Sequence, residues 1–185
     1  MGKLQYLIKY QNNMEARIEL LPERKLVGKR IRISLTNNKT AELFQGFMPK
    51  RKEIKNTIGT DIICMREYDA LPDFKNYDMN TVFDKWAAVE VADFTGIPEG
   101  MESFVLKGGM YAVFDYKGNN SPVASANLFQ YIFGTWLPNS AYELDDRPHF
   151  EILGAKYKNN DPDSEEEICI PVKAKRYSRL IFFRQ

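Results

Sequence analysis

The feature that most constrains the fold is a pattern that occurs twice along the chain. Strand-like runs give way to one helix and then to two more strand-like runs. The apolar spacing changes from alternating to helical after about Thr40, and again after Ser121-Pro122. The tripeptide Leu43-Phe44-Gln45 recurs as Leu128-Phe129-Gln130 at the same place in each expected helix. Two such β-α-β-β units can pack their helices on one side of antiparallel sheets and leave a cleft between the halves.

We therefore predict an α+β protein built from a duplicated β-α-β-β module. The pseudo-repeats cover about 15–95 and 101–175 of a domain that spans 15–185, and residues 1–14 form an N-terminal extension. Strands are expected at 15–21, 25–34, 61–68, 85–91, 102–106, 110–116, 150–157 and 167–172. The first helix should stop or kink at Pro49, and the second should end near Leu137-Pro138.

Composition excludes several classes of function. Twenty-six basic and 25 acidic residues give a net charge of +1, so no long-range field attracts nucleic acid or an anionic membrane. The N-terminus lacks the apolar core of a signal peptide and no segment is apolar enough to span a bilayer, which predicts a cytoplasmic protein. Cys64 and Cys169 lie in apolar runs and are expected to be reduced core thiols. A single histidine, His149, disfavours a metal centre, and no cofactor is indicated.

The segment 165–172 takes an acidic run directly into a short apolar strand. Side chains alternate along a strand, so Ile168 and Ile170 share one face while Glu167 and Cys169 share the other. If the isoleucines anchor the core, Glu167 points into the space across the sheet. There a desolvated carboxylate selects a positively charged ligand. The alternative is a surface strand whose acids are solvated.

Four segments resemble the motifs of the GyrI-like small-molecule-binding domain, which is also the effector-binding domain of AraC-type and MerR-type multidrug-sensing regulators. They are 109–118, 128–140, 142–151 and 167–172. The resemblance covers nearly the whole chain from about residue 15. About fifteen residues precede the domain, too few for a helix-turn-helix, so we expect no direct DNA binding by this polypeptide alone.

The resemblance implies a pocket for bulky, often cationic aromatic molecules, with a glutamate at the position of Glu167 as counter-charge. It also implies an aromatic rim, where cations are held by the negative faces of the rings. The candidate ligand-binding residues are Glu167, Trp136, Tyr111, Phe150, Tyr68 and Trp86. Packing in the core is the competing role for each aromatic residue in this set.

Three functions remain open at this stage. The first is a binding protein for a small hydrophobic or cationic ligand, of unknown oligomeric state. The second is a hydrolase of strained electrophilic natural products, because some stand-alone GyrI-like proteins have that activity; Glu167 would then be the catalytic base. The third and weakest is a gyrase-type protein inhibitor, in which the acidic run 161–167 mimics nucleic-acid charge, although a solvated loop explains that run better.

Overall fold

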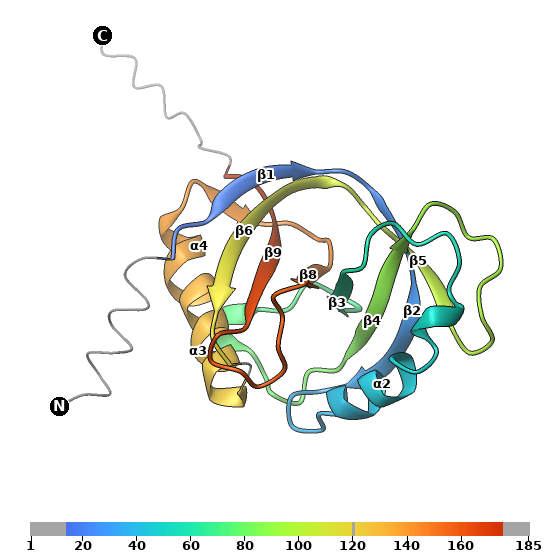
Figure 1. Ribbon diagram of the computed structural model, residues 1–185. Helices are drawn as coiled ribbons and strands as arrows, with labels where there is room; N and C mark the ends of the chain where they lie inside the picture. The colour runs from blue at the N-terminus through green and yellow to red at the C-terminus, as the bar shows by residue number, and fades with distance from the viewer. Residues whose placement is uncertain (1–13, 120, 176–185) are drawn as a thin grey trace, which may run out of the picture.

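The computed structural model describes residues 14–119 and 121–175, which form one curved antiparallel sheet with helices on its outer side (Figure 1). The strands of this part of the chain are β1 (Arg17–Leu21), β2 (Arg24–Ile33), β3 (Ile62–Glu67), β4 (Phe83–Val91), β5 (Glu102–Leu106), β6 (Gly109–Lys117), β7 (Tyr142–Leu144), β8 (His149–Leu153) and β9 (Glu165–Ala174). Their order is β1-β6-β9-β8-β3-β4-β2-β5, and β7 pairs with the far end of β9. The predicted extension, 1–14, lies almost entirely outside the described residues.

The helical segments within 14–119 and 121–175 are short. They are α2 (Thr40–Phe47), η1 (Arg51–Glu53), η2 (Phe74–Asn76), α3 (Pro122–Tyr131), the π-helical turn η3 (Ile132–Trp136) and α4 (Leu137–Asn139). None of the described helices is long and apolar enough to cross a membrane.

The two main helices cover the same face of the sheet. The helix α2 packs through Leu43 and Phe47 on a cluster that includes Val89 of β4. The helix α3 packs through Leu128 on a cluster that includes Ile168 and Ile170 of β9. Residues that lie directly opposite each other in neighbouring strands share a face of the sheet. The strand pairs that lead across the sheet from β2 through β4, β3, β8 and β9 to β6 therefore place both clusters on one side. The prediction that the helices lie on one side of the sheet is therefore confirmed.

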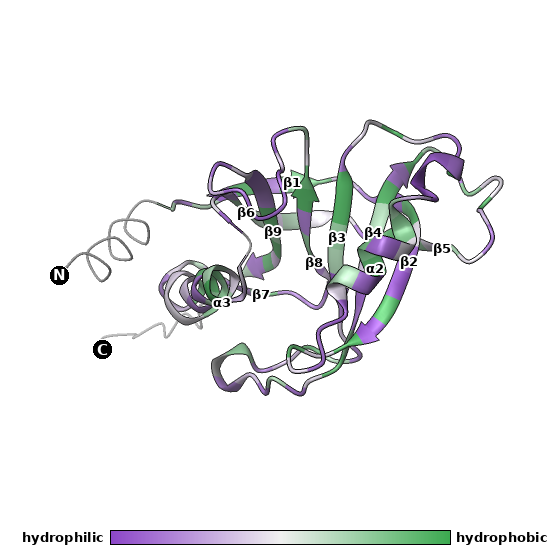
Figure 2. Cartoon of the chain, turned by 60° about the horizontal axis from the view of Figure 1, so that its bottom comes forward, coloured by the Kyte–Doolittle hydropathy of each residue, from purple (hydrophilic) through white to green (hydrophobic). Residues whose placement is uncertain are grey.

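The opposite face is concave and has its own apolar cluster, which we call the inner cluster. It consists of Leu26, Ile63, Met65, Trp86, Ala88, Leu106, Tyr111, Val113, Phe150 and Cys169. Since the central strands β3 and β4 are buried on both faces, they are apolar over most of their length and appear largely green in Figure 2. As predicted, Cys64 and Cys169 are both free and buried. The structure places them on opposite faces of the sheet.

The start of α3 follows from its sequence, but its end does not. The hydroxyl Oγ of Ser121 accepts a hydrogen bond from the backbone N–H of Ala124 at 3.2 Å, and Pro122 occupies the first turn, as expected for Ser-Pro. The helical course then continues through the η3 turn and α4, so it passes Pro138 instead of ending before it. Proline is tolerated there because it lies in the first turn of the new helix α4. The first helix does stop at Phe47, before Pro49.

Candidate functional site

Three of the predicted site residues lie together in the inner cluster. Trp86, Tyr111 and Phe150 are each at most 2% exposed, and the rings of Tyr111 and Phe150 meet edge to face with centroids 5.3 Å apart. The Tyr111 hydroxyl donates to the carbonyl of Lys107 at 3.2 Å, and the Arg147 guanidinium lies 4.5 Å from the centre of its ring. Burial raises the pKa of the Tyr111 phenol, although Arg147 opposes this shift. These aromatic residues therefore form the floor beneath the concave face.

The structure separates Trp136 and Tyr68 from that floor. Trp136 lies on the helix-covered face, where its ring meets Phe114 at 5.1 Å and stacks near Tyr142 at 6.5 Å. Tyr68 follows β3 and packs against Phe83 at 5.1 Å. The aromatic residues predicted to form one rim thus lie at different places, and Trp136 packs against the cluster on the helix-covered face.

A pocket with a volume of about 450 Å³ lies beside Glu167. It opens where the N-terminal end of β9, the C-terminal end of β6 and the loop after β8 meet. Its lining is Asp61, Asp115, Tyr116, Lys117, Ile152, Gly154, Ala155, Lys156, Glu165, Glu166 and Glu167. Five carboxylates against two ammonium groups give this lining a negative charge, which favours a cation. We call it the acidic pocket.

Glu167 is at the rim of the acidic pocket and is not buried. Its side chain is 43% exposed, and its Oε1 accepts from Nη2 of Arg17 at 2.8 Å. Arg17 also pairs with Asp115 and, at 2.9 Å, with Glu19, and these hydrogen bonds, the one to Asp115 first, raise the pKa of the guanidinium. Sequence reasoning placed Glu167 on the correct face but assigned it a desolvated environment. The strand β1, which carries Arg17, supplies a cation instead.

A second cavity, of about 190 Å³, lies at the other end of the concave face. Glu67, Tyr68, Leu71, Phe104, Val105, Lys107, Asp146, Arg147 and Pro148 line it. The indole N–H of Trp86 donates to Oε2 of Glu67 at 2.9 Å, and Phe104 packs on Trp86 with ring centroids 5.4 Å apart. This cavity combines a carboxylate and aromatic side chains, but sequence reasoning did not select Glu67 or Phe104. Neither residue stood out in the sequence, because Glu67 follows Arg66 at the end of its strand and Phe104 is one of three apolar residues in a short strand.

Sequence reasoning also missed a buried charged cluster beneath the helices. Glu151 lies opposite Cys64 in the sheet, and its carboxylate meets Lys85 at 3.4 Å and Arg66 at 3.5 Å. Burial raises the pKa of Glu151, but the two cations outweigh it and the net shift is downward. His149 is 3% exposed, and its Nε2 has no hydrogen-bond partner within the described residues. Burial, and then Arg66 and Lys85, hold the pKa of His149 well below its usual value.

The described residues contain no group of three or more histidine, cysteine, aspartate or glutamate side chains arranged to hold a metal ion.

Comparison with known proteins identifies one family model, described as Cass2, an integron-associated effector binding protein, which matches residues 17–172. Among curated proteins none matches significantly. Solved structures that share the fold include the following three. SAV2435 bound to tetraphenylphosphonium is 18% identical, with a TM-score of 0.56 over 86% of this chain and 94% of that one. The EcmrR C-terminal domain is 17% identical, with a TM-score of 0.62 over 88% and 99%. The Vibrio cholerae integron cassette protein is 13% identical, with a TM-score of 0.56 over 87% and 99%.

Proposed function

Since the chain belongs to the Cass2 family of integron-associated effector-binding proteins, we propose that it binds a bulky organic cation in the acidic pocket. The pocket's volume of about 450 Å³ falls within the range of roughly 300 to 1,000 Å³ typical of small-molecule sites. The observation that carries the proposal is the excess of carboxylates around this space. A relative of the same fold is bound to tetraphenylphosphonium, a cation surrounded by phenyl rings.

We assign Glu167 the role of counter-charge for that cation. Its carboxylate lines the pocket next to Asp115, to which it lies opposite in the β6–β9 pair. Beyond Glu167 along the same face of β9 comes Cys169 of the inner cluster, so an apolar ligand group can continue toward Phe150 and Tyr111. Arg17 competes with the ligand for Glu167 and Asp115, which makes release of this arginine part of binding.

We also propose that the fold arose from a duplicated module and that the ligand cleft follows the symmetry of that module. The strand order reads the same from both ends if β2, β4 and β3 correspond to β6, β9 and β8. The register agrees with this correspondence. Arg17 lies opposite Val113, and Glu102 lies opposite Gly28. Arg17 is 85 positions before Glu102, and Gly28 is 85 positions before Val113, so the two pairs are equivalent. Leu43 and Leu128, also 85 positions apart, are both buried under their helices.

The assignment of Glu167 is tested by its replacement with glutamine. We expect Glu167→Gln to weaken tetraphenylphosphonium binding by about tenfold or more, because it removes a charged partner of the ligand and leaves Arg17 less neutralised. Isothermal titration calorimetry with tetraphenylphosphonium and the neutral triphenylphosphine oxide measures this change. The neutral compound should lose little affinity.

Glu143→Gln is the matched control. Glu143 lies on β7, pairs with Lys173 at 3.6 Å and does not line the acidic pocket, yet its replacement changes the net charge equally. Equal losses in both variants would mean that only the net charge matters. Equal losses for both ligands in Glu167→Gln would mean that the pocket selects by shape.

A further inference from the structure

The buried charged cluster on the helix-covered face holds more positive than negative charge. Arg66 of β3 and Lys85 of β4 share one carboxylate, that of Glu151 on β8, at 3.5 and 3.4 Å. The three side chains are only 5% to 15% exposed. Burial raises the pKa of Glu151, but the two cations shift it downward overall, so the carboxylate stays ionised at neutral pH. Within the described residues, this cluster therefore has one positive charge more than its carboxylate can balance.

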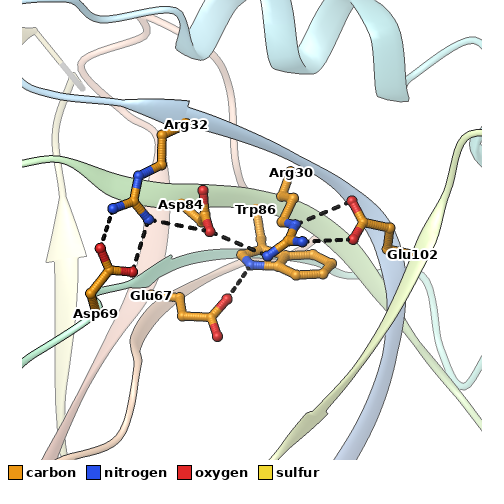
Figure 3. A network of polar contacts seen from close by, with 7 residues as sticks. All are labelled: Arg30, Arg32, Glu67, Asp69, Asp84, Trp86 and Glu102. Atoms are coloured by element: carbon orange, nitrogen blue, oxygen red, sulfur yellow. Dashed lines mark hydrogen bonds and ion pairs between the residues drawn. The ribbon is translucent and has the colours of Figure 1, made fainter.

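The concave face of the same sheet shows a different balance (Figure 3). There Arg30 pairs with Asp84 and Glu102, and Arg32 pairs with Asp69 and Asp84. Each arginine has a carboxylate of its own, and the two side chains are 42% and 41% exposed, so water also solvates them. Beneath the helices water gives little such help, because burial removes most of the hydration of a charge.

Two polar atoms beside the charged cluster have no hydrogen-bond partner within the described residues. They are Nε of Arg66 and Nε2 of His149, and both are buried. The two residues lie directly opposite each other in the β3–β8 pair, so their side chains leave the same face of the sheet about 5 Å apart. Both reach the ring of Phe129, with the Arg66 Cζ at 4.4 Å and the imidazole centre at 5.6 Å from its centroid. Buried polar atoms of this kind point to a bound water or ion.

Aromatic rings surround the imidazole of His149 and restrict the size of any ligand. The ring centroids of Tyr68 and Phe74 lie 5.9 Å from it, and that of Phe133 lies 6.1 Å from it. His149 itself is 3% exposed. A ligand between His149 and Arg66 must therefore be as small as a water molecule or a monatomic ion.

The other elements packed around this place add no negative charge to it. The helix α3 and the turn η3 contain no charged residue. The hydroxyls of Tyr68 and Tyr77 lie 3.2 Å apart and hydrogen-bond to each other, and burial raises the pKa of Tyr77, which keeps it neutral. Asp73 and Asp78, in the loop that carries η2, are exposed. The positive charge of the cluster therefore calls for an anion from solution.

We propose that Arg66 and His149 bind a small monovalent anion, such as chloride, beneath the helices. The Nε–H of Arg66 and the Nε2–H of the neutral imidazole donate to the ion, and the excess charge of Arg66 and Lys85 over Glu151 balances it. A water molecule would satisfy the two nitrogen atoms but would leave the charge uncompensated. This site lies on the opposite face of the sheet from the acidic pocket and takes a ligand of the opposite charge.

The single histidine of the chain makes the test specific, because one imidazole signal reports on the site. Sodium chloride is titrated against sodium gluconate at pH 7 and a constant ionic strength of about 0.15 M, so that general screening does not change. We expect a saturable change in the imidazole nitrogen shifts of His149, and a thermal midpoint that rises with chloride because the ion binds the folded state. If the shifts of His149 do not respond to chloride, water occupies this place and the proposal is wrong.

Two variants change the charge of the cluster in opposite directions. Lys85→Met should weaken chloride binding by about tenfold or more, whereas Glu151→Gln should tighten it by a similar factor. Lys173→Met is the matched control, because Lys173 is 55% exposed and pairs with Glu143 at the surface. Equal losses in Lys85→Met and Lys173→Met would show that only the net charge of the protein matters, which would overturn the proposal.

Bromide provides a test that needs no variant. In crystals of the unaltered protein soaked in sodium bromide, an anomalous scattering peak should lie within hydrogen-bonding distance of Arg66 Nε and His149 Nε2. Bromide peaks confined to the surface of the protein would contradict the proposal, even if chloride raised the thermal midpoint.

Discussion

His149 is the single histidine of the chain, and it is buried between cations and aromatic rings. Its ring lies 5.6 Å from that of Phe129 and 5.9 Å from those of Phe74 and Tyr68. Arg66 is its direct neighbour on β3 and extends over Phe129 at 4.4 Å. A positive charge on His149 would lie near those of Arg66 and Lys85, with little solvent to screen it.

We expect this histidine to make the protein less stable in mild acid. Its pKa in the folded state is well below the value near 6.5 in the unfolded chain, so the unfolded state binds the proton first. Stability should therefore be complete above about pH 6.5 and should fall by up to about 1.4 kcal/mol per pH unit below it. Urea denaturation between pH 7 and pH 5 measures this slope.

The variants His149→Phe and His149→Gln provide the comparison. Both remove the proton-binding group, and phenylalanine keeps a ring among the neighbouring aromatics. Each should show a flatter dependence between pH 6.5 and pH 5, whatever its stability at pH 7. If the free energy of unfolding fell with pH equally steeply in both variants, the loss of stability in acid would come from carboxylates and not from His149.

At the level of the elements, the strands β2 and β4 lie so close together at Gly28 that no side chain fits between them. Gly28 lies opposite Ala88, and a Cβ built on it would lie 2.2 Å from the carbonyl oxygen of Ala87 and 2.6 Å from the Cβ of Ala88. Glycine inside a strand is typical of a bulge or of a close approach by another backbone, and at Gly28 the structure shows the close approach. Backbone atoms cannot move aside as the end of a flexible side chain can.

We expect Gly28→Ala to destabilise the protein by about 1 to 3 kcal/mol, because the β2–β4 pair must shift to admit the methyl group. The control is Gly46→Ala in α2, where the nearest atom to the new Cβ would be Nζ of Lys29 at 3.6 Å. That change should be neutral or stabilising by up to about 1 kcal/mol, since alanine favours the helix. Thermal denaturation should show a lower midpoint for Gly28→Ala and an unchanged or higher midpoint for Gly46→Ala. An unchanged midpoint for Gly28→Ala would show that the strands can move apart without cost.

At the level of the whole molecule, strands from the first half of the chain (17–91) pair with strands from the second half (102–174). The strand β1, from the first half, pairs with β6, and β5, from the second half, pairs with β2. The central pair β3–β8 also joins the halves. Three strand pairs must therefore break before either half can separate, and neither half has a complete sheet of its own.

This exchange predicts a single cooperative unfolding transition. Trp86 reports on the first half and Trp136 on the second, so the variants Trp136→Phe and Trp86→Phe each follow one half by fluorescence. Within each variant, the urea midpoint from fluorescence should coincide with that from far-UV circular dichroism, and no intermediate should accumulate. If fluorescence and circular dichroism gave separate midpoints in either variant, the halves would be independent folding units.

Sequence alone determined what depends on neighbouring residues. Alternation along the strands placed Ile168 and Ile170 on the core face and Glu167 on the other, and Ser121-Pro122 fixed the start of α3. These signals are local, because a strand alternates its side chains and a cap binds the turn that follows it. The short strand β7 was missed, because its three residues are defined only by their pairing with β9.

Only the tertiary structure decided which side chains meet. Arg17 and Glu167 are 150 positions apart, and their pairing required β1 to add to the edge of β6 next to β9. The same assembly placed Trp136 beneath the helices and Trp86 on the concave face, although both are tryptophans in apolar segments. Whether a carboxylate is desolvated or paired with an arginine depends on which strand lies next to its own in the sheet. Sequence could therefore place Glu167 on its face of the strand and propose it as a candidate, but its charge environment was set by the order of strands in the sheet.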